Sequence, residues 1–309
     1  MSKREILVVG SINVDLLLFQ ERLPLRGETL VAEGMREEFG GKGANQAVQA
    51  ARLDQSVIFL GAVGKDERGR ASRKNLEANR IECHLQEVDT PTGLGVVSIL
   101  DNGEVHATIL RGANGDVTPE WIRDNANLFE RAGVVILQNE IPAEANEEAI
   151  RLARAAGARI IYNAAPARAV SQSLAQQCDY FIVNEEEAMF FLGERLTTRA
   201  DIEDAIPRLH EYCARLVVTL GAEGSLLATE SGTHYIAAVP VRALDTTGAG
   251  DAYVGAFASS LLDGVSEVQA ASIAAKVAGL ATTGVGAQTS MPTSEDITND
   301  SVRAEAQDS

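Results

Sequence analysis

Positive charge is scarce in this chain of 309 residues. Lysine and arginine together number 27 against 44 aspartates and glutamates, which gives a formal net charge of −17 at pH 7 and a pI near 4.7. An acidic surface repels polyanions, and salt screens its field within a Debye length of roughly 10 Å. We therefore expect no nucleic-acid or anionic-membrane partner, and any phosphate must be bound at a local site.

Long apolar runs, paired cysteines and clustered histidines are also missing. No run is long enough to cross a bilayer, and the amino terminus reaches Glu5 too soon for a signal peptide, so we expect a cytoplasmic protein without membrane contact. The three cysteines and four histidines are scattered without metal-ligand spacing, and we assign none to catalysis or metal binding. A G-x-S-x-G elbow is absent, and so is a Walker A box, because Gly43 follows Gly41 and Lys42.

Apolar β-branched runs alternate with helix-compatible segments through most of the chain. This alternation predicts a doubly wound α/β fold, with a mostly parallel sheet flanked by helices and ligands at the carboxyl ends of its strands. With 45% hydrophobic residues, the core can be large. The expected strands are 6–9, 57–60, 134–137, 159–162, 180–183 and 216–220, and the expected helices include 67–78, 143–155, 171–177, 185–192 and 268–283.

Two other regions alternate as short exposed strands do and stand apart from the main pattern. The first covers about 16–39, and the second covers about 93–111 around an Asp101-Asn-Gly103 hairpin turn. Together they predict a small β-sheet, for which a lid is the natural role. We expect 1–295 to form a single α/β domain carrying this lid, and 296–309 to be a polar, loosely ordered tail.

The stretch Leu244–Phe257, LDTTGAGDAYVGAF, has the pattern of a glycine-rich turn that opens a helix. The first turn of a helix has free backbone N–H groups and the positive end of the macrodipole, and glycines let that backbone approach an anion. Asp251 stands beside this expected anion site. It is either a general base for an alcohol that attacks a phosphoryl group, or a cap that complements the helix dipole.

Asn13 and Asp15 follow the first expected strand. Their spacing of two places both side chains on one face if the strand continues, so that they could bind adjacent hydroxyls of a polyol. The alternative for either residue is a turn or capping role.

Two further motifs combine polar side chains with expected helix starts. In 40–47, GGKGANQA, three glycines allow close approach of a ligand, and Lys42 and Asn45 offer donors to hydroxyls; a plain glycine-rich turn is the alternative. Asn184 and Glu187 lie one helical turn apart after strand 180–183. They either face one ligand or hydrated cation together or cap the next helix.

Taken together, these motifs resemble the ribokinase/PfkB carbohydrate-kinase family. The likeness covers nearly the whole chain, and the signatures GGKGANQA at 40–47 and DTTGAGD at 245–251 occur in the family's order and separation. Ala164 and Val183 stand where relatives usually have proline, which concerns the backbone and leaves the chemistry intact. The resemblance implies ATP-dependent phosphorylation of a sugar, with the primary hydroxyl of D-ribose as the expected acceptor, and a homodimer that clasps through its lids.

The resemblance also implies roles for individual residues. Asp251 is the expected catalytic base, and the N–H groups of Gly248, Ala249 and Gly250 form the expected anion hole. The positions that match the family's sugar site are Asn13, Asp15, Gly41, Lys42, Asn45, Glu140 and Asp251. Those that match its site for ATP and hydrated Mg²⁺ are Asn184, Glu187, Thr219, Gly221 and Gly224. A monovalent cation, usually K⁺, is implied near Asp245, Thr247, Ala281, Gly284, Gly286 and Ser290.

Two alternatives to ribose phosphorylation stay open. The acceptor could be deoxyribose, a ketohexose or pseudouridine, because segments 103–110 and 138–141, near the far side of the sugar, match the family less well. The chain could also be a non-catalytic sugar or nucleotide sensor. The sequence disfavours the sensor, since a sensor need not retain Asp251 and its glycines.

Overall fold

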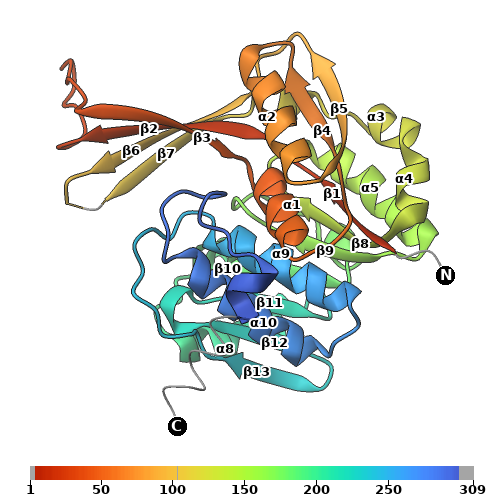
Figure 1. Cartoon of the computed structure of the whole chain (residues 1–309). Helices are drawn as coiled ribbons and strands as arrows, with labels where there is room; N and C mark the ends of the chain where they lie inside the picture. Colours follow the sequence, from red (N-terminus) through yellow and green to blue (C-terminus); the bar gives the residue numbers. More distant parts are fainter. Residues whose placement is uncertain (1–3, 103, 299–309) are drawn as a thin grey trace.

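The computed structural model describes residues 4–102 and 104–298, and a nine-stranded sheet forms the centre of the fold (Figure 1). Its strand order is β13-β12-β11-β10-β9-β8-β1-β4-β5, parallel from β11 to β5, with β12 and β13 added antiparallel. The strands are β1 (Glu5–Val9), β4 (Val57–Gly64), β5 (Glu82–Val88), β8 (Ala132–Gln138), β9 (Arg159–Asn163), β10 (Tyr180–Asn184), β11 (Leu216–Thr219), β12 (Ser225–Thr229) and β13 (Gly232–Ile236). The prediction of a mostly parallel α/β sheet is confirmed.

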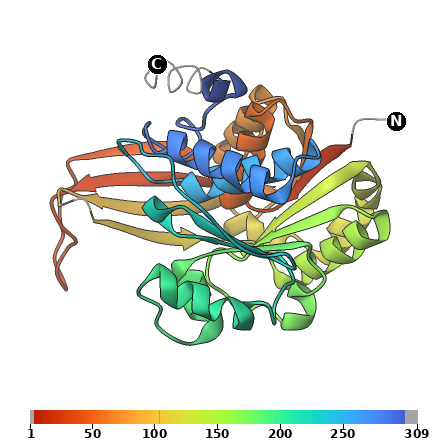
Figure 2. The ribbon, with the colours of Figure 1, turned by 90° about the horizontal axis from the view of Figure 1, so that it is seen from below.

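Helices cover both faces of this sheet, and Figure 2 shows α9 and α10 in blue on one side with the green helices on the other. The helices are α1 (Lys42–Arg52), α2 (Glu67–Ala78), α3 (Pro119–Asp124), α4 (Ala126–Arg131), α5 (Ala143–Ala156), α6 (Gln172–Ala175), α7 (Glu185–Leu192), α8 (Arg199–Leu209), α9 (Ala249–Leu262) and α10 (Glu267–Ala281), with short 3-10 turns η1 (Gly112–Asp116) and η2 (Gly221–Glu223). None of the helices in the described part of the chain has the length and apolar character needed to span a membrane.

The core lies in two layers, one on each face of the sheet. Helices α3, α4, α5, α7 and α8 contribute to one layer, and α1, α2, α9 and α10 to the other. Strand β1 shows why its apolar run predicts a central parallel strand: Leu7 and Val9 enter the first layer, whereas Ile6 and Val8 enter the second. Successive side chains of a strand point to opposite faces, so a strand buried on both faces must be apolar throughout.

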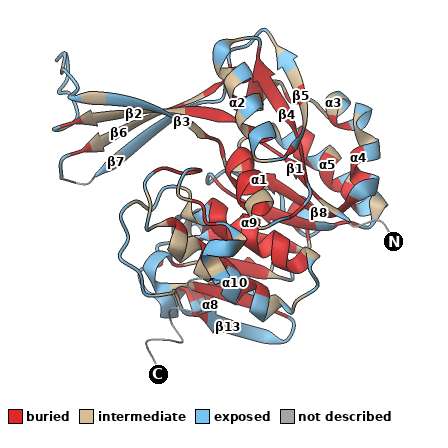
Figure 3. Ribbon diagram, in the orientation of Figure 1, coloured by how far each residue is buried: buried red, intermediate tan, exposed pale blue. Residues whose placement is uncertain are grey.

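A separate four-stranded sheet, hereafter the small sheet, projects from the main body (Figure 1). Its order is β3 (Gly34–Gly40), β2 (Asn13–Gln20), β6 (Gly93–Leu100) and β7 (Val105–Leu110), and β7 is largely exposed (Figure 3). Strands β6 and β7 pair antiparallel on either side of the expected hairpin turn, although Gly103 itself lies outside the described residues.

Strand β2 corrects one expectation about the sugar-site residues. Asn13 and Asp15 do not extend β1: the chain turns after Val9, and both residues lie at the start of β2 in the small sheet. Their spacing of two still places both side chains on one face, but of β2 and not of a continued β1. Strand β2, whose first residue is Asn13, begins at the root of the small sheet, where this sheet joins the main body (Figure 1).

Both glycine-rich motifs are helix starts, but the helices begin earlier than expected. Helix α1 begins at Lys42, so most of GGKGANQA is itself helical, and α9 begins at Ala249, so Asp251 lies within its first turn. The residues before them, Gly41 and Gly248, have φ values of 89° and 79°. Only glycine adopts this region readily, which explains why each helix starts directly after a glycine.

The carboxyl-terminal segment differs from the expected tail. Residues 294–298 are helical, so the boundary expected at 296 falls within a helical turn. Residues 299–309 lie outside the described part of the chain.

Candidate active site

Asp251 lies at the centre of the candidate site. Its side chain is 7% exposed, and its two carboxylate oxygens accept hydrogen bonds from different amides, Oδ2 from Nδ2 of Asn45 and Oδ1 from Nε2 of Gln46, each at 2.9 Å. Burial raises the pKa of Asp251, against the opposing effects of the Lys42 ammonium and the two amides. The residue at the N-cap of α9 is Gly248, so Asp251 does not cap its own helix.

The first turn of α9 presents the expected anion-binding backbone. N–H groups at this position have no acceptor within the helix, and the macrodipole places positive potential there. The N–H of Ala249 already donates to the carbonyl of Thr246 at 3.2 Å, so it has a partner inside the turn. At Gly250 an added Cβ would meet no atom within 4 Å, which shows open space directly beside this backbone.

A cavity of about 760 Å³ opens over this turn. Its size is within the range of sites that hold nucleotides and other small molecules. Among the residues singled out from the sequence, its lining contains Lys42, Asn184, Glu187, Thr219, Gly221, Gly224, Gly248, Ala249, Gly250 and Asp251. The structure thus brings the expected base, the expected anion hole and the expected nucleotide residues to one cavity.

An apolar wall completes the cavity. It comes from the segment after β13, with Val239, Pro240 and Val241, and from Ala275 and Ala278 on α10. An apolar wall opposite polar strand ends suits a flat heteroaromatic ring. No sequence pattern indicated this wall, because a short valine-proline segment and an alanine-rich helix also occur where side chains only pack in a protein core.

Asn184, at the end of β10, and Glu187, in the first turn of α7, both line the cavity. Their side chains and backbones form a reciprocal capping box at the start of α7, with both hydrogen bonds at 2.8 Å. Burial raises the pKa of Glu187, with Lys42 among the opposing influences. The two alternatives drawn from the sequence are therefore compatible: the pair caps α7 and also lines the cavity, where carboxylate and amide oxygens suit hydrated Mg²⁺.

Four carboxylates act electrostatically on the Lys42 side chain and form a polar cluster with it. Burial would lower the pKa of Lys42, but Asp251, Glu140, Glu187 and Asp15 raise it above its ordinary value, so the ammonium stays charged. This cluster joins the expected base to the expected sugar positions. A cation between acidic groups also allows several carboxylates to remain together in a partly buried site.

Glu140 and Asp15 are the members of this cluster that belong to the expected sugar site. Glu140 Oε2 accepts hydrogen bonds from Oγ of Ser11 at 2.5 Å and from the backbone N–H of Lys42 at 3.0 Å. Burial, reinforced by Glu140 and Glu38, raises the pKa of Asp15 to about 6. The cluster is thus poor in positive charge apart from Lys42, as suits a neutral polyol rather than an anion.

Asn114 supports Asn13, another residue of the expected sugar site, and no sequence pattern singled it out. The residue is 1% exposed in η1, where its Oδ1 accepts the N–H of Ile12 and its Nδ2 donates to the carbonyl of Ile12 and to Oδ1 of Asn13. Because Oδ1 of Asn13 accepts this last bond, the amide nitrogen of Asn13 faces away from Asn114. An asparagine within RGANGD resembles any turn residue, so no local signal could have identified it.

The residues expected around a monovalent cation lie near one another beside α9. Asp245 accepts hydrogen bonds from the N–H groups of Thr247 at 2.9 Å and Gly286 at 2.8 Å, and Ser290 Oγ donates to the Gly286 carbonyl at 2.6 Å. Although burial opposes it, these N–H groups hold the pKa of Asp245 below its usual value. Gly284 approaches Ser290 so closely that an added Cβ would lie 2.8 Å from it.

This donor set fits a hard monovalent cation, because its carboxylate, carbonyl and hydroxyl atoms are all oxygens. Ala281 is buried at the end of α10, directly before Thr282, whose carbonyl accepts the N–H of Leu244. Within residues 4–102 and 104–298, no three His, Cys, Asp or Glu side chains are grouped to hold a metal ion.

A buried carboxylate beside a helix amino terminus, at the carboxyl edge of a doubly wound sheet, suits a small-molecule phosphotransferase with an α/β fold. The chain belongs to the pfkB family of carbohydrate kinases, whose family model matches residues 3–294.

Known proteins similar to this chain include ribokinases and a deoxyribokinase. The Bacillus subtilis ribokinase is 35% identical, with 95% of this chain and 98% of that protein covered. The Salmonella typhi deoxyribokinase is also 35% identical, with 94% and 96% covered. Among solved structures, Thermotoga maritima ribokinase is 32% identical with a TM-score of 0.87, and Arabidopsis thaliana ribokinase complexed with ribose and ATP is 30% identical with a TM-score of 0.87; each comparison covers 96% of this chain and 98% of that one.

Proposed function

We propose that this protein is an ATP-dependent kinase that transfers the γ-phosphoryl group to the 5-hydroxyl of D-ribose. The observation that carries the proposal is the position of Asp251. Its buried carboxylate lines the same cavity as Lys42 and the first turn of α9, with open space beside Gly250. A sugar hydroxyl on one side and a phosphoryl group on the other would meet at this carboxylate.

In the proposed reaction Asp251 takes the proton of the 5-hydroxyl, and the hydroxyl oxygen attacks the γ-phosphorus of ATP. The bond from the γ-phosphorus to the β–γ bridging oxygen breaks, and ADP leaves. The first-turn N–H groups of α9 stabilise charge that develops on the transferred oxygens. Gly248 and Gly250 keep this backbone free of side chains, and Lys42 adds a positive charge from the sugar side. The sugar hydroxyls are bound by Asn13, Asp15, the Gly41 backbone, Lys42, Asn45 and Glu140.

ATP binds in the 760 Å³ cavity, with its base against the apolar wall and its phosphates toward α9. Asn184, Glu187, Thr219, Gly221 and Gly224 line the phosphate and ribose end. When bound, Mg²⁺ neutralises phosphate charge, and Glu187 would hold it through its water shell. The oxygens around Asp245 would hold K⁺, which supplies positive charge next to the anion hole.

The small sheet acts as a lid over the sugar. Asn13 and Asp15 are at its root, so its movement changes the sugar site directly, and closure would exclude water that could hydrolyse ATP. Its exposed apolar side chains, Met35 on β3 and Leu110 on β7 among them, favour a homodimer in which two lids clasp. We also propose a single α/β domain with this lid, located in the cytoplasm.

The deoxyribokinase relative makes 2-deoxyribose the second candidate acceptor, because it and the Bacillus ribokinase are each 35% identical to this chain. Coupled ADP release decides between the two, with D-ribose, 2-deoxyribose, fructose, adenosine and pseudouridine each assayed with and without K⁺. We expect the fastest turnover with D-ribose and an increase with K⁺. Turnover with only a different sugar would replace ribose as the proposed acceptor. ATP binding without turnover of any acceptor would favour the non-catalytic sensor.

A further inference from the structure

Gln46 belongs to the GGKGANQA motif, yet none of the proposed roles uses it. It lies in α1, and its side chain is completely buried. Its Nε2 donates to Oδ1 of Asp251 at 2.9 Å and to Oδ1 of Asn163 at 3.0 Å, and its Oε1 accepts from Nε2 of Gln138 at 2.8 Å. Both N–H bonds and the carbonyl oxygen of this amide are thus used.

The neighbours of Gln46 determine which way its amide faces. Gln138, at the end of β8, donates to Oε1 and thereby places Nε2 toward Asp251. Asn163, at the end of β9, donates its own Nδ2 to the Ile182 carbonyl, so that its oxygen faces Gln46. A reversed Gln46 amide would set oxygen against oxygen at both Asp251 and Asn163.

A second chain of amides holds the other oxygen of Asp251. Asn45 donates to Oδ2, and its Oδ1 accepts from Nε2 of Gln288 at 2.9 Å. Gln288 in turn accepts from Nδ2 of Asn75 at 2.7 Å. Two consecutive residues of α1 therefore hold both oxygens of the Asp251 carboxylate, which sets the plane of the group as well as its position.

We propose that Gln46 is a positioning residue for phosphoryl transfer: its N–H holds Asp251 in the ionised form and in one orientation. The proposal rests on the proposed function, in which Asp251 is the base. A buried carboxylate oxygen that loses its donor is poorly solvated, so the proton binds more tightly. The freed carboxylate can also rotate, and small misplacements of a catalytic group are costly.

The test compares Gln46→Met with the matched control Gln49→Met. Gln49 lies one turn further along α1, is equally buried and donates to the Pro292 carbonyl, away from Asp251. For Gln46→Met we expect kcat with D-ribose to fall at least about tenfold, and the acid limb of kcat to move up by about one pH unit. The KM for ribose should change less than about threefold, because Gln46 is not among the sugar-binding residues.

A second readout does not depend on turnover. The carboxyl ¹³C resonance of Asp251, assigned by its loss in Asp251→Asn, reports its pKa directly in the folded protein. The pKa should rise by about one unit in Gln46→Met and stay constant in Gln49→Met. An unchanged pKa, or an equal loss of kcat in both variants, would overturn the proposal and leave Gln46 with a packing role.

These readouts separate this proposal from the proposed function. If wild-type protein phosphorylates no sugar, or if Asp251→Asn retains turnover, the base assignment fails and the positioning role in catalysis fails with it. If both hold and Gln46→Met has normal kcat and a normal acid limb, only the positioning role is overturned.

Discussion

The side-chain nitrogen of Asn114 donates a hydrogen bond to Oδ1 of Asn13 over 2.8 Å, although 101 residues separate them in the chain. Asn114 also binds both backbone groups of Ile12, so it clamps the turn between β1 and β2. Its position links η1 to the root of the small sheet. The contact fixes the orientation of the Asn13 amide before any sugar binds.

Replacing Asn114 by alanine should therefore weaken sugar binding. Without its partner the Asn13 amide can rotate, and loss of one neutral hydrogen bond corresponds to about a three- to tenfold rise in KM for ribose. We expect kcat to change little, because Asp251 is untouched. Steady-state kinetics measure both values. The control is Asn125→Ala, which removes a side-chain hydrogen bond to the backbone carbonyl of Trp121. An unchanged KM would contradict this role.

Asp251→Asn should lower kcat by at least about a hundredfold, because an amide cannot take the proton of the attacking hydroxyl. The fold should persist, since asparagine has nearly the same shape, and ATP affinity measured by calorimetry should stay within a few fold. Turnover close to that of the wild type would refute the general-base mechanism.

The raised pKa of Asp15, about 6, predicts an acid limb for sugar capture. Below this pH the carboxyl is protonated in the free protein and loses acceptor capacity, so kcat/KM for ribose should fall about tenfold per pH unit. Asp15→Asn should have a low kcat/KM at pH 8 and a flatter profile below pH 6. If the acid limb of kcat/KM is unchanged in Asp15→Asn, the limb reports the titration of another group.

The same shift predicts an effect on stability. The folded protein binds the Asp15 proton more tightly than the unfolded chain, whose pKa is near 3.8, so this group destabilises the fold increasingly as the pH rises from about 4 to about 6. Asp15→Asn should therefore raise Tm at pH 8, where the wild-type carboxylate is charged. At pH 3.5 the two Tm values should converge. Thermal unfolding without sugar measures both, and a lower Tm for Asp15→Asn at pH 8 would contradict the prediction.

Two glycines of the first α9 turn should respond differently to alanine. Gly248 has φ 79°, and a Cβ there would lie 3.0 Å from Ala287 Cα, so Gly248→Ala should cost about 1–2 kcal/mol or more in stability. At Gly250 a Cβ meets nothing, so Gly250→Ala should fold normally, yet its methyl group would enter the anion site. We expect its turnover to fall about ten- to a hundredfold.

Gly264→Ala is the control for backbone strain alone, since Gly264 has φ 81° and open space around it. It should lose stability and retain turnover. If Gly250→Ala also retains turnover, the anion site does not lie against that residue.

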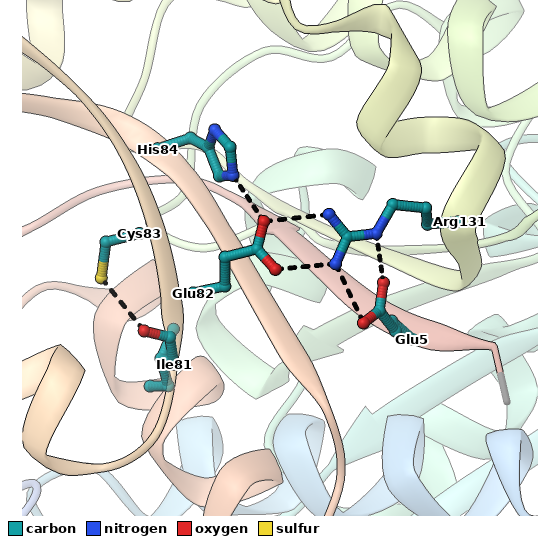
Figure 4. A network of polar contacts seen from close by, with 6 residues as sticks. All are labelled: Glu5, Ile81, Glu82, Cys83, His84 and Arg131. Carbon is teal, nitrogen blue, oxygen red and sulfur yellow. Dashed lines mark hydrogen bonds and ion pairs between the residues drawn. The ribbon is translucent and has the colours of Figure 1, made fainter.

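Arg131, the last residue of α4, joins this helix to the amino ends of β1 and β5 (Figure 4). Its guanidinium pairs with Glu5 of β1 and Glu82 of β5, each with a contact of 2.7 Å, and this pairing, together with His84, lowers the pKa of Glu82 to about 2. Because the groups are partly exposed, we expect Arg131→Met to cost only about 1 kcal/mol.

The pH dependence of that cost follows from the depressed pKa of Glu82. The stabilisation is complete above the ordinary value of 4.5 and is lost as the pH falls toward about 2. The Tm difference between wild type and Arg131→Met should shrink over this range and in about 1 M salt. Arg154→Met, whose pair with Asp179 is 3.9 Å long, is the control and should change Tm less.

The sequence alone determined the elements whose signals are local. An apolar run such as Ile6–Val9 predicts a strand buried on both faces, and glycines before Lys42 and Ala249 predict helix starts, because periodicity and backbone freedom belong to neighbouring residues. The order of such elements also predicts the parallel sheet. The two glycine-rich signatures were sufficient to indicate the family.

Only the tertiary structure decided which polar groups meet. The turn after Val9 moves Asn13 from the main sheet to the small one, and the bonds of Asp251 to Gln46 and of Asn13 to Asn114 cross 205 and 101 residues. Burial, which raises the pKa of Asp251, also comes from the packing of α9 against the rest of the fold. Hydrogen bonding and desolvation depend on distances in space, and these are set once the sheet and its helices have assembled.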